Sequence, residues 1–396
     1  MIKYKGNQYV SFMVIVLSFL VYLDLGNYAG ILSGVAAAPK YIYFGIFLLL
    51  IPIVVLYFNE FVAYLGRGFS VWCGLFVLVN ILHILFLLQF GSESAVSMTA
   101  TRIQTIGFAL LVGFVYEKSD PKYYGKIIVF VAVTLTSLQL IDFFTPGFFV
   151  PAGTEGLVLG RSSSTLVNAN KSAEVLLLMS VIGLATLRPS LRIWLFAIVF
   201  PGVLLTFSRS GIFIWFGILF SCVYFKILTF RSSALLLAVI ILLSYLIYEL
   251  LFDQLIGGLH GGSVDDILDR ISFFTNLNAS DASAIERLDV SRFALDSFYE
   301  NPILGNGSGY TYFWSVADQA PHNQYLLMLA EFGMLGFIIW LSLIYLLRGV
   351  GFCFESMGAA KVRVIFVLFI LFISLFTHNI FDNLYWLVTF SYVAKR

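Results

Sequence analysis

The sequence predicts an all-α, polytopic membrane protein. Of its 396 residues, 60% are hydrophobic and only 11% are charged, whereas soluble globular proteins carry about 25% charged residues. Apolar runs recur along the chain, and many approach the roughly 20 residues that a membrane-spanning helix needs. One long polar stretch, residues 253–322, interrupts them. We therefore expect transmembrane helices joined by short loops, with one large loop that itself contains helices.

Twelve apolar segments are the candidate spans. They are residues 10–25, 41–58, 69–90, 102–116, 127–144, 172–187, 193–207, 211–228, 233–252, 323–347, 364–378 and 384–394. This count gives nine transmembrane helices over residues 1–252, a large extracytoplasmic loop over residues 253–322, and three transmembrane helices over residues 323–396. Lys3 and Lys5 precede the first apolar run, and we expect an uncleaved first helix there rather than a signal peptide.

Basic residues support this topology, because cytoplasmic loops carry an excess of Lys and Arg. With the N-terminus inside, 15 of the 23 basic residues fall on the cytoplasmic side, and both termini are cytoplasmic. The others lie outside, where the orientation rule disfavours them: Lys40, Arg102, Arg161, Lys171, Arg209, Arg270, Arg287 and Arg292. These outer cations are therefore the first candidates for a functional role.

Two outer arginines lie in polar turns at the ends of spans. Arg209 lies in LLTFSRSGIF, and Arg161 lies in LGRSSSTLVNANKSAE, which leads into the sixth span. The side chain of either arginine could simply reach from the end of a span to the membrane interface, with its charged head group in water. Alternatively, a guanidinium forms a rigid fork to phosphate or diphosphate oxygens, and the hydroxyls near Arg161, with Asn168 and Asn170, could bind sugar or phosphate. The residues alone leave both interpretations open.

Arg287 and Arg292 lie on an amphipathic helix predicted over residues 283–301, which Pro302 ends. Three apolar residues of this helix form a stripe at spacings of seven and four. They are Leu288, Leu295 and Tyr299. Arg292 falls inside the stripe and Arg287 on the opposite face, so helical phase predicts that Arg292 is the buried residue. A pair between Arg292 and Asp296 would be an equally ordinary explanation.

His322 opens an apolar run in the sequence QAPHNQYLL. It could be an interfacial residue with a satisfied hydrogen bond. It could also accept a proton from a sugar hydroxyl, since the unperturbed pKa of histidine is near neutrality. The preceding LGNGSGY turn lacks the strand-turn-helix context of a nucleotide site, and we expect a flexible turn. His83 and His378 are expected to pack within spans, although His378 and Asn379, with Asp382, could form a second polar pocket. No His/Cys set has metal-ligand spacing, so we expect no metal and no cofactor.

Three motifs, in this order, resemble those of a known family. LLTFSRSG, ERLDVSRFALDSFYENPILGNGSG and HNQYLLMLAEFGMLG together are similar to the O-antigen ligase and polymerase superfamily, over about residues 160–345. The resemblance implies a GT-C-like membrane glycosyltransferase in which Arg209, Arg287 and His322 serve the reaction. Arg161 resembles an earlier outer-loop arginine of the family, although the N-P-N that often follows reads Asn168-Ala169-Asn170 here. The expected substrate-binding residues are Arg161, Arg292, Asn323 and Asn170.

The resemblance also implies the substrate and the compartment. The donor would be a glycan on undecaprenyl diphosphate, used without a metal ion on the outer face of the bacterial inner membrane. A polymerase joins such lipid-linked units into O-antigen or capsular polysaccharide, whereas a ligase transfers the glycan to the lipid A core. A chain-length regulator and a flippase are candidate protein partners, and we expect no nucleic acid.

The charge of the large loop favours the polymerase. Residues 253–321 contain ten acidic residues and three arginines, and an acidic surface would repel the phosphorylated acceptor of a ligase. The ligase stays the alternative. A flippase or transporter of lipid-linked glycans is a third interpretation, but few charges interrupt the interiors of the predicted spans, where a transport pathway would need polar groups.

Overall fold

The computed structural model describes residues 2–35, 38–90, 93–145, 147–150, 161–242, 245, 282–313, 320–349 and 359–394. Within these ranges every regular element is a helix, which confirms the all-α class. The first part of the expected large loop, residues 253–281, and its residues 314–319 lie outside the described ranges.

The first half of the chain forms α1 (Ile2–Tyr22), α2 (Leu25–Ser33), α3 (Ala38–Leu56), α4 (Phe58–Leu65), α5 (Gly68–Phe90), α6 (Glu93–Lys118), α7 (Pro121–Phe144), η1 (Ser164–Leu166) and α8 (Ala169–Thr186). The second half forms α9 (Pro189–Leu205), α10 (Arg209–Tyr224), α13 (Ala282–Glu300), α14 (Tyr310–Phe313), α15 (Gln324–Gly349), α16 (Ala359–Ile373) and α17 (Leu384–Val393). A further short apolar helix covers Phe230–Leu242.

Among the described residues, six helices are long and apolar enough to cross a membrane, so the protein is multi-pass. Their bounds are Pro39–Leu56, Gly68–Leu85, Glu93–Lys118, Pro121–Phe144, Ala169–Thr186 and Gln324–Arg348. The pair Gln8–Tyr22 and Leu25–Ser33, bent by 59°, would make a seventh span. The expected twelve spans are not confirmed, because several of the predicted segments fold as helices shorter than 18 residues.

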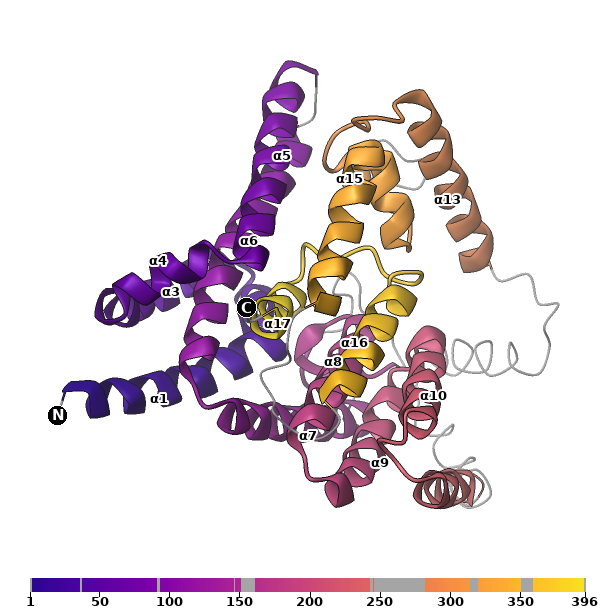
Figure 1. Ribbon diagram of the computed structural model, residues 1–396. Helices are drawn as coiled ribbons and strands as arrows, with labels where there is room; N and C mark the ends of the chain where they lie inside the picture. The colour runs from indigo at the N-terminus through magenta and orange to yellow at the C-terminus, as the bar shows by residue number, and fades with distance from the viewer. Residues whose placement is uncertain are drawn as a thin grey trace.

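Helix α8 lies at the centre of one group of helices and is packed by α7, α9, α10 and α16 (Figure 1). All its residues from Ser172 to Ala185 are buried. Small residues permit this close packing: a Cβ on Gly183 would lie 2.5 Å from Leu195 of α9, and one on Gly125 of α7 would lie 1.9 Å from Thr186. Close approach of backbones is the usual basis of helix association in membranes.

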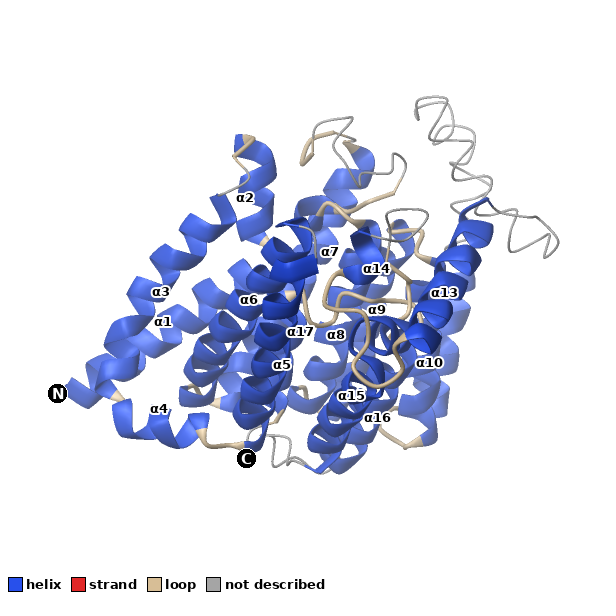
Figure 2. Cartoon of the chain, turned by 90° about the horizontal axis from the view of Figure 1, so that it is seen from above, coloured by secondary structure: helices blue, strands red, loops and turns tan. Residues whose placement is uncertain are grey.

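Helix α6 organises a second group and packs against α5 and α17 (Figure 2). The sequence predicted a span over residues 102–116, but the helix starts nine residues earlier, at Glu93. Arg102 therefore lies inside α6 and is fully buried, at 1% exposure, rather than at the end of an outer loop.

A break in α15 receives the glycine-rich turn at residues 301–309. At Gly333 the backbone leaves helical geometry, with φ 61° and ψ −153°. Four backbone hydrogen bonds join the turn to both sides of this break. In two of them the turn donates: the N–H of Asn306 to the carbonyl of Ala330 (3.1 Å) and that of Gly307 to Glu331 (3.0 Å). In the other two α15 donates: the N–H of Met334 to the carbonyl of Pro302 (2.8 Å) and that of Leu335 to Ile303 (3.2 Å). They replace helical bonds whose loss inside an apolar span would leave polar groups unsatisfied.

This turn is docked, and the expectation of a flexible turn is wrong. Gly305 has φ 75°, and a Cβ there would lie 2.4 Å from the backbone of Glu331. A Cβ on Gly333 would lie 2.6 Å from the backbone of Ile303. Glycine is needed at both positions because it accepts positive φ and permits this contact. The docked turn also fixes α13, which forms over nearly the predicted residues and lies along α15 (Figures 1 and 2).

The docked turn predicts a stability effect. Gly333→Ala or Gly305→Ala should destabilise the detergent-purified protein by about 2 kcal/mol or more, because alanine is strained at positive φ and its Cβ would overlap backbone atoms. Melting temperature measures the effect. Gly217→Ala on α10, whose Cβ would meet nothing within 4 Å, is the control. Equal melting temperatures for Gly333→Ala and Gly217→Ala would contradict the docking.

Candidate functional site

Arg161 connects the N-termini of α8 and α10. Its Nε donates to the carbonyl of Thr206 at 2.7 Å, and its Nη2 donates to Oδ1 of Asn170 at 2.7 Å. Thr206 belongs to the turn that precedes Arg209, the first residue of α10. The structure thus brings together three predicted site residues, Arg161, Asn170 and Arg209, around the positive ends of two helix dipoles.

Local packing and caps hold these two N-termini side by side. Asn168 caps α8 by accepting the N–H of Asn170 at 2.9 Å, and Ser208 caps α10 by accepting that of Gly211 at 3.2 Å. A Cβ on Gly211 would lie 2.8 Å from Ala173 in the first turn of α8. The SR-G motif therefore needs its glycine because α8 passes close by.

Strained backbone surrounds the same arginines. Ser164, Val167 and Phe207 are non-glycine residues with positive φ, at 49°, 62° and 46°. Such residues each cost about 1–3 kcal/mol and gather at functional sites, where the surrounding structure holds them. Their position here, in the turns that carry Arg161 and Arg209, favours a binding role over a simple interfacial one.

His322 contacts a second histidine. It lies immediately before α15, and its ring centroid is 4.9 Å from that of His378, with an angle of 69° between the rings. Gln324 fixes the neighbouring loop, because its N–H donates to the carbonyl of Ser374 at 2.8 Å and its Oε1 accepts the N–H of Ile380 at 3.3 Å. The prediction that His378 packs within a span is wrong: α16 ends at Ile373, and His378 lies in the loop before α17.

Burial keeps both imidazoles neutral. It lowers the pKa of His322 to about 4, and the positive charge of Arg287 contributes. The pKa of His378 is lowered to about 3 by burial and, to a smaller extent, by His322, Lys171 and Arg102. Neutral imidazoles can accept a proton at pH 7. These effects also place Arg287 and Lys171 within electrostatic range of the histidine pair.

A buried carboxylate links α8 to the histidine loop. Glu174, one turn after Lys171, accepts hydrogen bonds from Oη of Tyr385 at 3.1 Å and from Nε1 of Trp386 at 3.4 Å. Both donors lie in the first turn of α17, directly after the loop that carries His378. One polar region therefore runs from Arg161 and Arg209, along the start of α8, to His378, His322 and Arg287.

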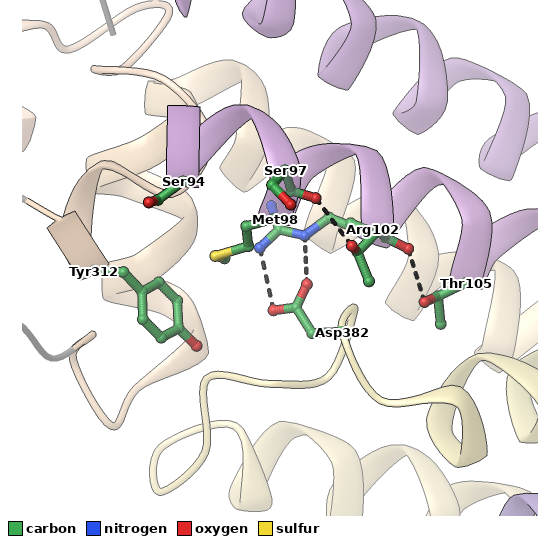
Figure 3. A pocket seen from close by; sticks show the side chains of 8 residues that line it. Ser94, Ser97, Met98, Arg102, Thr105, Tyr312 and Asp382 are labelled. Atoms are coloured by element: carbon green, nitrogen blue, oxygen red, sulfur yellow. Dashed lines mark hydrogen bonds and ion pairs between the residues drawn. The ribbon is translucent and has the colours of Figure 1, made fainter. Parts of the chain in front are cut away.

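Arg102 is one of the outer cations of the sequence but was not among the predicted site residues, and the structure makes it central. Its Nε and Nη2 donate to the two carboxylate oxygens of Asp382 at 2.6 and 3.1 Å (Figure 3). Its Nη1 donates to Oγ of Ser308 at 2.9 Å and lies 3.6 Å from a carboxylate oxygen of Glu331. An arginine inside a membrane-spanning helix is a functional hypothesis by default, but the predicted span began at Arg102 itself and so placed this residue at the outer boundary.

The helical-phase prediction for α13 is wrong. The side chain of Arg292 is 77% exposed, and its nearest acidic partner is Asp289, at 4.0 Å, rather than Asp296. The apolar stripe that includes Leu288 is exposed, whereas the small residues of the opposite side are buried. The buried residues are Val290, Ala294 and Ser297. Arg292 thus gains no support for substrate binding, while Arg287, although exposed, is the arginine that acts on His322.

Asn323 has a structural function that accounts for its position. Its Oδ1 accepts the N–H groups of Tyr325 at 2.9 Å and Leu326 at 3.2 Å. Asn323 thus caps α15 and fixes the backbone next to His322. Substrate binding by Asn323 and Asn170 stays a prediction. In the described part of the chain, no group of three His, Cys, Asp or Glu side chains is placed to hold a metal ion.

The comparisons with known proteins bear on this arrangement. Residues 194–341 match the family model described as O-antigen ligase. The matched segment runs from α9 to α15 and includes Arg209, Arg287 and His322, whereas Arg161 precedes it. No curated protein matches the chain. Residues 194–341 therefore carry an O-antigen ligase domain, and this match confirms the resemblance to the O-antigen ligase and polymerase superfamily that the three motifs predicted.

Proposed function

We propose that this protein polymerises undecaprenyl diphosphate-linked glycan units on the outer face of the bacterial inner membrane. The family indicates a membrane enzyme that transfers glycans. The observation that carries the finer proposal is the neutral His322, which feels the charge of Arg287 and packs against His378, which in turn feels the charge of Lys171 at the start of α8.

Arg161, Lys171 and Arg209 would bind the diphosphate of the donor. Guanidinium groups form charge-assisted hydrogen bonds to phosphate oxygens, and two helix N-termini add favourable potential for an anion. As the bond between the anomeric carbon and the diphosphate breaks, negative charge grows on the leaving group. Fixed cations at this place stabilise that charge in the transition state.

His322 would act as the general base. The acceptor hydroxyl attacks the anomeric carbon, and its proton passes to the neutral imidazole while the diphosphate leaves with the bonding electrons. His378 packs against His322 and restricts its orientation. Burial keeps His322 in the neutral form, Arg287 adds to this effect, and Arg287 would approach the donor phosphates from α13.

The placement of charge supports the outward orientation. With cytoplasmic termini, the cations proposed to bind the donor all fall on the outer side of the membrane. Nucleotide sugars are not expected there, so a lipid-linked donor is required. The acidic residues 253–321 favour a polymerase over a ligase, whose acceptor is phosphorylated. The ligase stays the second candidate, because the matching family model is described as O-antigen ligase.

Loss of the proposed base or of the donor arginine should change the surface polysaccharide of the cell. A deletion strain complemented with His322→Ala or Arg209→Ala is expected to retain about 1% or less of the wild-type transfer, the usual loss for a general base. A single repeat on the core would identify the polymerase, whereas long chains on the carrier with a bare core would identify the ligase. Arg292→Ala is the control, and normal polysaccharide from both site variants would contradict the proposal.

The lowered pKa of His322 predicts an unusual pH profile. Because its pKa is about 4, the transfer rate of the purified enzyme should stay nearly constant from pH 8 to about pH 5 and fall as the imidazole protonates below that. Arg287→Gln removes a positive charge that lowers this pKa, so the acid limb should move to higher pH. Arg292→Gln should leave it in place. A wild-type limb centred near pH 6.5 would exclude the buried His322 as the base.

A further inference from the structure

A pocket of about 490 Å³ lies beside Arg102, between α6, α14 and the loop before α17 (Figure 3). This volume is within the range of small-molecule sites. Most of its polar lining consists of hydroxyl groups. The polar residues are Ser94, Ser97, Thr101, Arg102, Thr105, Tyr312 and Asp382. Nothing in the donor region of α8 and α10 contributes to this lining.

The lining presents hydrogen-bond acceptors. Thr101 and Thr105 donate their own hydroxyl protons to the carbonyls four residues earlier, both at 2.9 Å, so their oxygen lone pairs are left to accept. The carboxylate of Asp382, 25% exposed, is also an acceptor. A ligand that suits this lining must supply several donors, as the hydroxyls of a sugar do.

The charge of the pocket does not suit a phosphate. Its one cation, Arg102, is engaged by the carboxylates of Asp382 and Glu331, so the three groups together carry no excess of positive charge. A phosphate would add negative charge and would supply no donors. The pocket is thus complementary to an uncharged, hydroxylated ligand, whereas the cations at the start of α8 and α10 are complementary to the diphosphate.

Aromatic contacts connect the pocket to the proposed base. Tyr312, which forms one wall, has its ring centroid 5.6 Å from that of His378. His378 in turn contacts His322 at 4.9 Å. The hydroxyl of Tyr312 donates to Oδ1 of Asn379 at 2.7 Å, which fixes the wall to the histidine loop. A ligand in the pocket would therefore lie on the α6 side of Tyr312, with the ring of Tyr312 between it and the histidine pair.

We propose that this pocket binds a sugar of the acceptor glycan and thereby positions the adjoining sugar, which carries the attacking hydroxyl, at His322. The inference rests on the proposed function, which it deepens by giving the acceptor a place separate from the donor diphosphate. It also specifies that the acceptor presents uncharged sugars at the site, as the acceptor of a polymerase does.

Equilibrium binding to the purified full-length protein in nanodiscs tests the pocket without requiring turnover. The probes are the repeat-unit glycan released from its carrier by mild acid, and undecaprenyl diphosphate without sugar. Ser97→Leu narrows the pocket and should weaken glycan binding about tenfold or more. Thr101→Val removes one acceptor and should weaken it about fivefold. Binding of undecaprenyl diphosphate should stay within about twofold of wild type in both variants.

Matched controls lie on α7, outside the pocket. Ser137 and Thr134 donate to the carbonyls four residues earlier at 3.0 Å each, as Thr101 does, so Ser137→Leu and Thr134→Val should bind both probes as wild type does. Unchanged glycan binding in Ser97→Leu and Thr101→Val, or no glycan binding by wild type, would contradict the proposal that this pocket binds the acceptor. Weakened binding of undecaprenyl diphosphate in these variants would overturn it as well, since the pocket would then serve the donor.

The proposed function fails by a different result. If His322→Ala and Arg209→Ala transfer glycan as wild type does, the proposed mechanism is wrong even where Ser97→Leu loses glycan binding. If those two variants lose transfer while Ser97→Leu keeps glycan binding, the mechanism stands and the acceptor pocket is wrong.

Discussion

The guanidinium of Arg102 is the contact on which the arrangement of the site depends. It joins α6 to three other segments: the turn at residues 301–309 through Ser308, the broken helix α15 through Glu331, and the loop before α17 through Asp382. A charge buried in a membrane protein is costly unless it is paired. Pairing with carboxylates on two different segments satisfies this requirement only when all of them are assembled. His378 lies four residues before Asp382, and His322 lies nine residues before Glu331, so the same contact positions both histidines.

The break in α15 is the second constraint. A continuous helix there would satisfy its own backbone, and the turn at residues 301–309 would have nowhere to dock. Because Gly333 opens the helix, this turn completes the backbone hydrogen bonding, and Gly307 and Ser308 reach Glu331 and Arg102. The turn holds α13 along α15 and thereby brings Arg287 within electrostatic range of His322. Positioning of a loop arginine thus follows from a local exception to helical geometry.

Much of the fold followed from the sequence because it depends on local properties. The apolar runs form helices near their predicted positions. The SR-G and HN motifs mark the N-terminal starts of α10 and α15, where Arg209 and His322 lie. Arg102 could not be predicted in its central role, because its partners Ser308 and Asp382 are 206 and 280 residues away in the chain. His378 was misplaced because an apolar run continues to Phe376 although the helix has already ended at Ile373.

The helix α13 shows a further limit of sequence patterns. Its large apolar residues, which would normally mark the buried face, are exposed, and it packs through Val290, Ala294 and Ser297 instead. Small residues allow close approach to a neighbouring helix, and the hydrophobic stripe therefore predicted the wrong face. The count of twelve spans is not confirmed, since apolar composition does not determine how long each helix is.

A double-mutant cycle between Arg102 and Asp382 tests most directly whether this contact assembles the site. Arg102→Met should lower the stability of the purified protein by about 3 kcal/mol or more, because it leaves the buried carboxylate of Glu331 without its cation. Asp382→Leu should cost about 1–3 kcal/mol, because Arg102 loses its bidentate partner but keeps Glu331. The double variant should be no less stable than the worse single one, with a coupling of about 1–3 kcal/mol. Losses that simply add, so that each residue acts alone, would contradict the central role of Arg102.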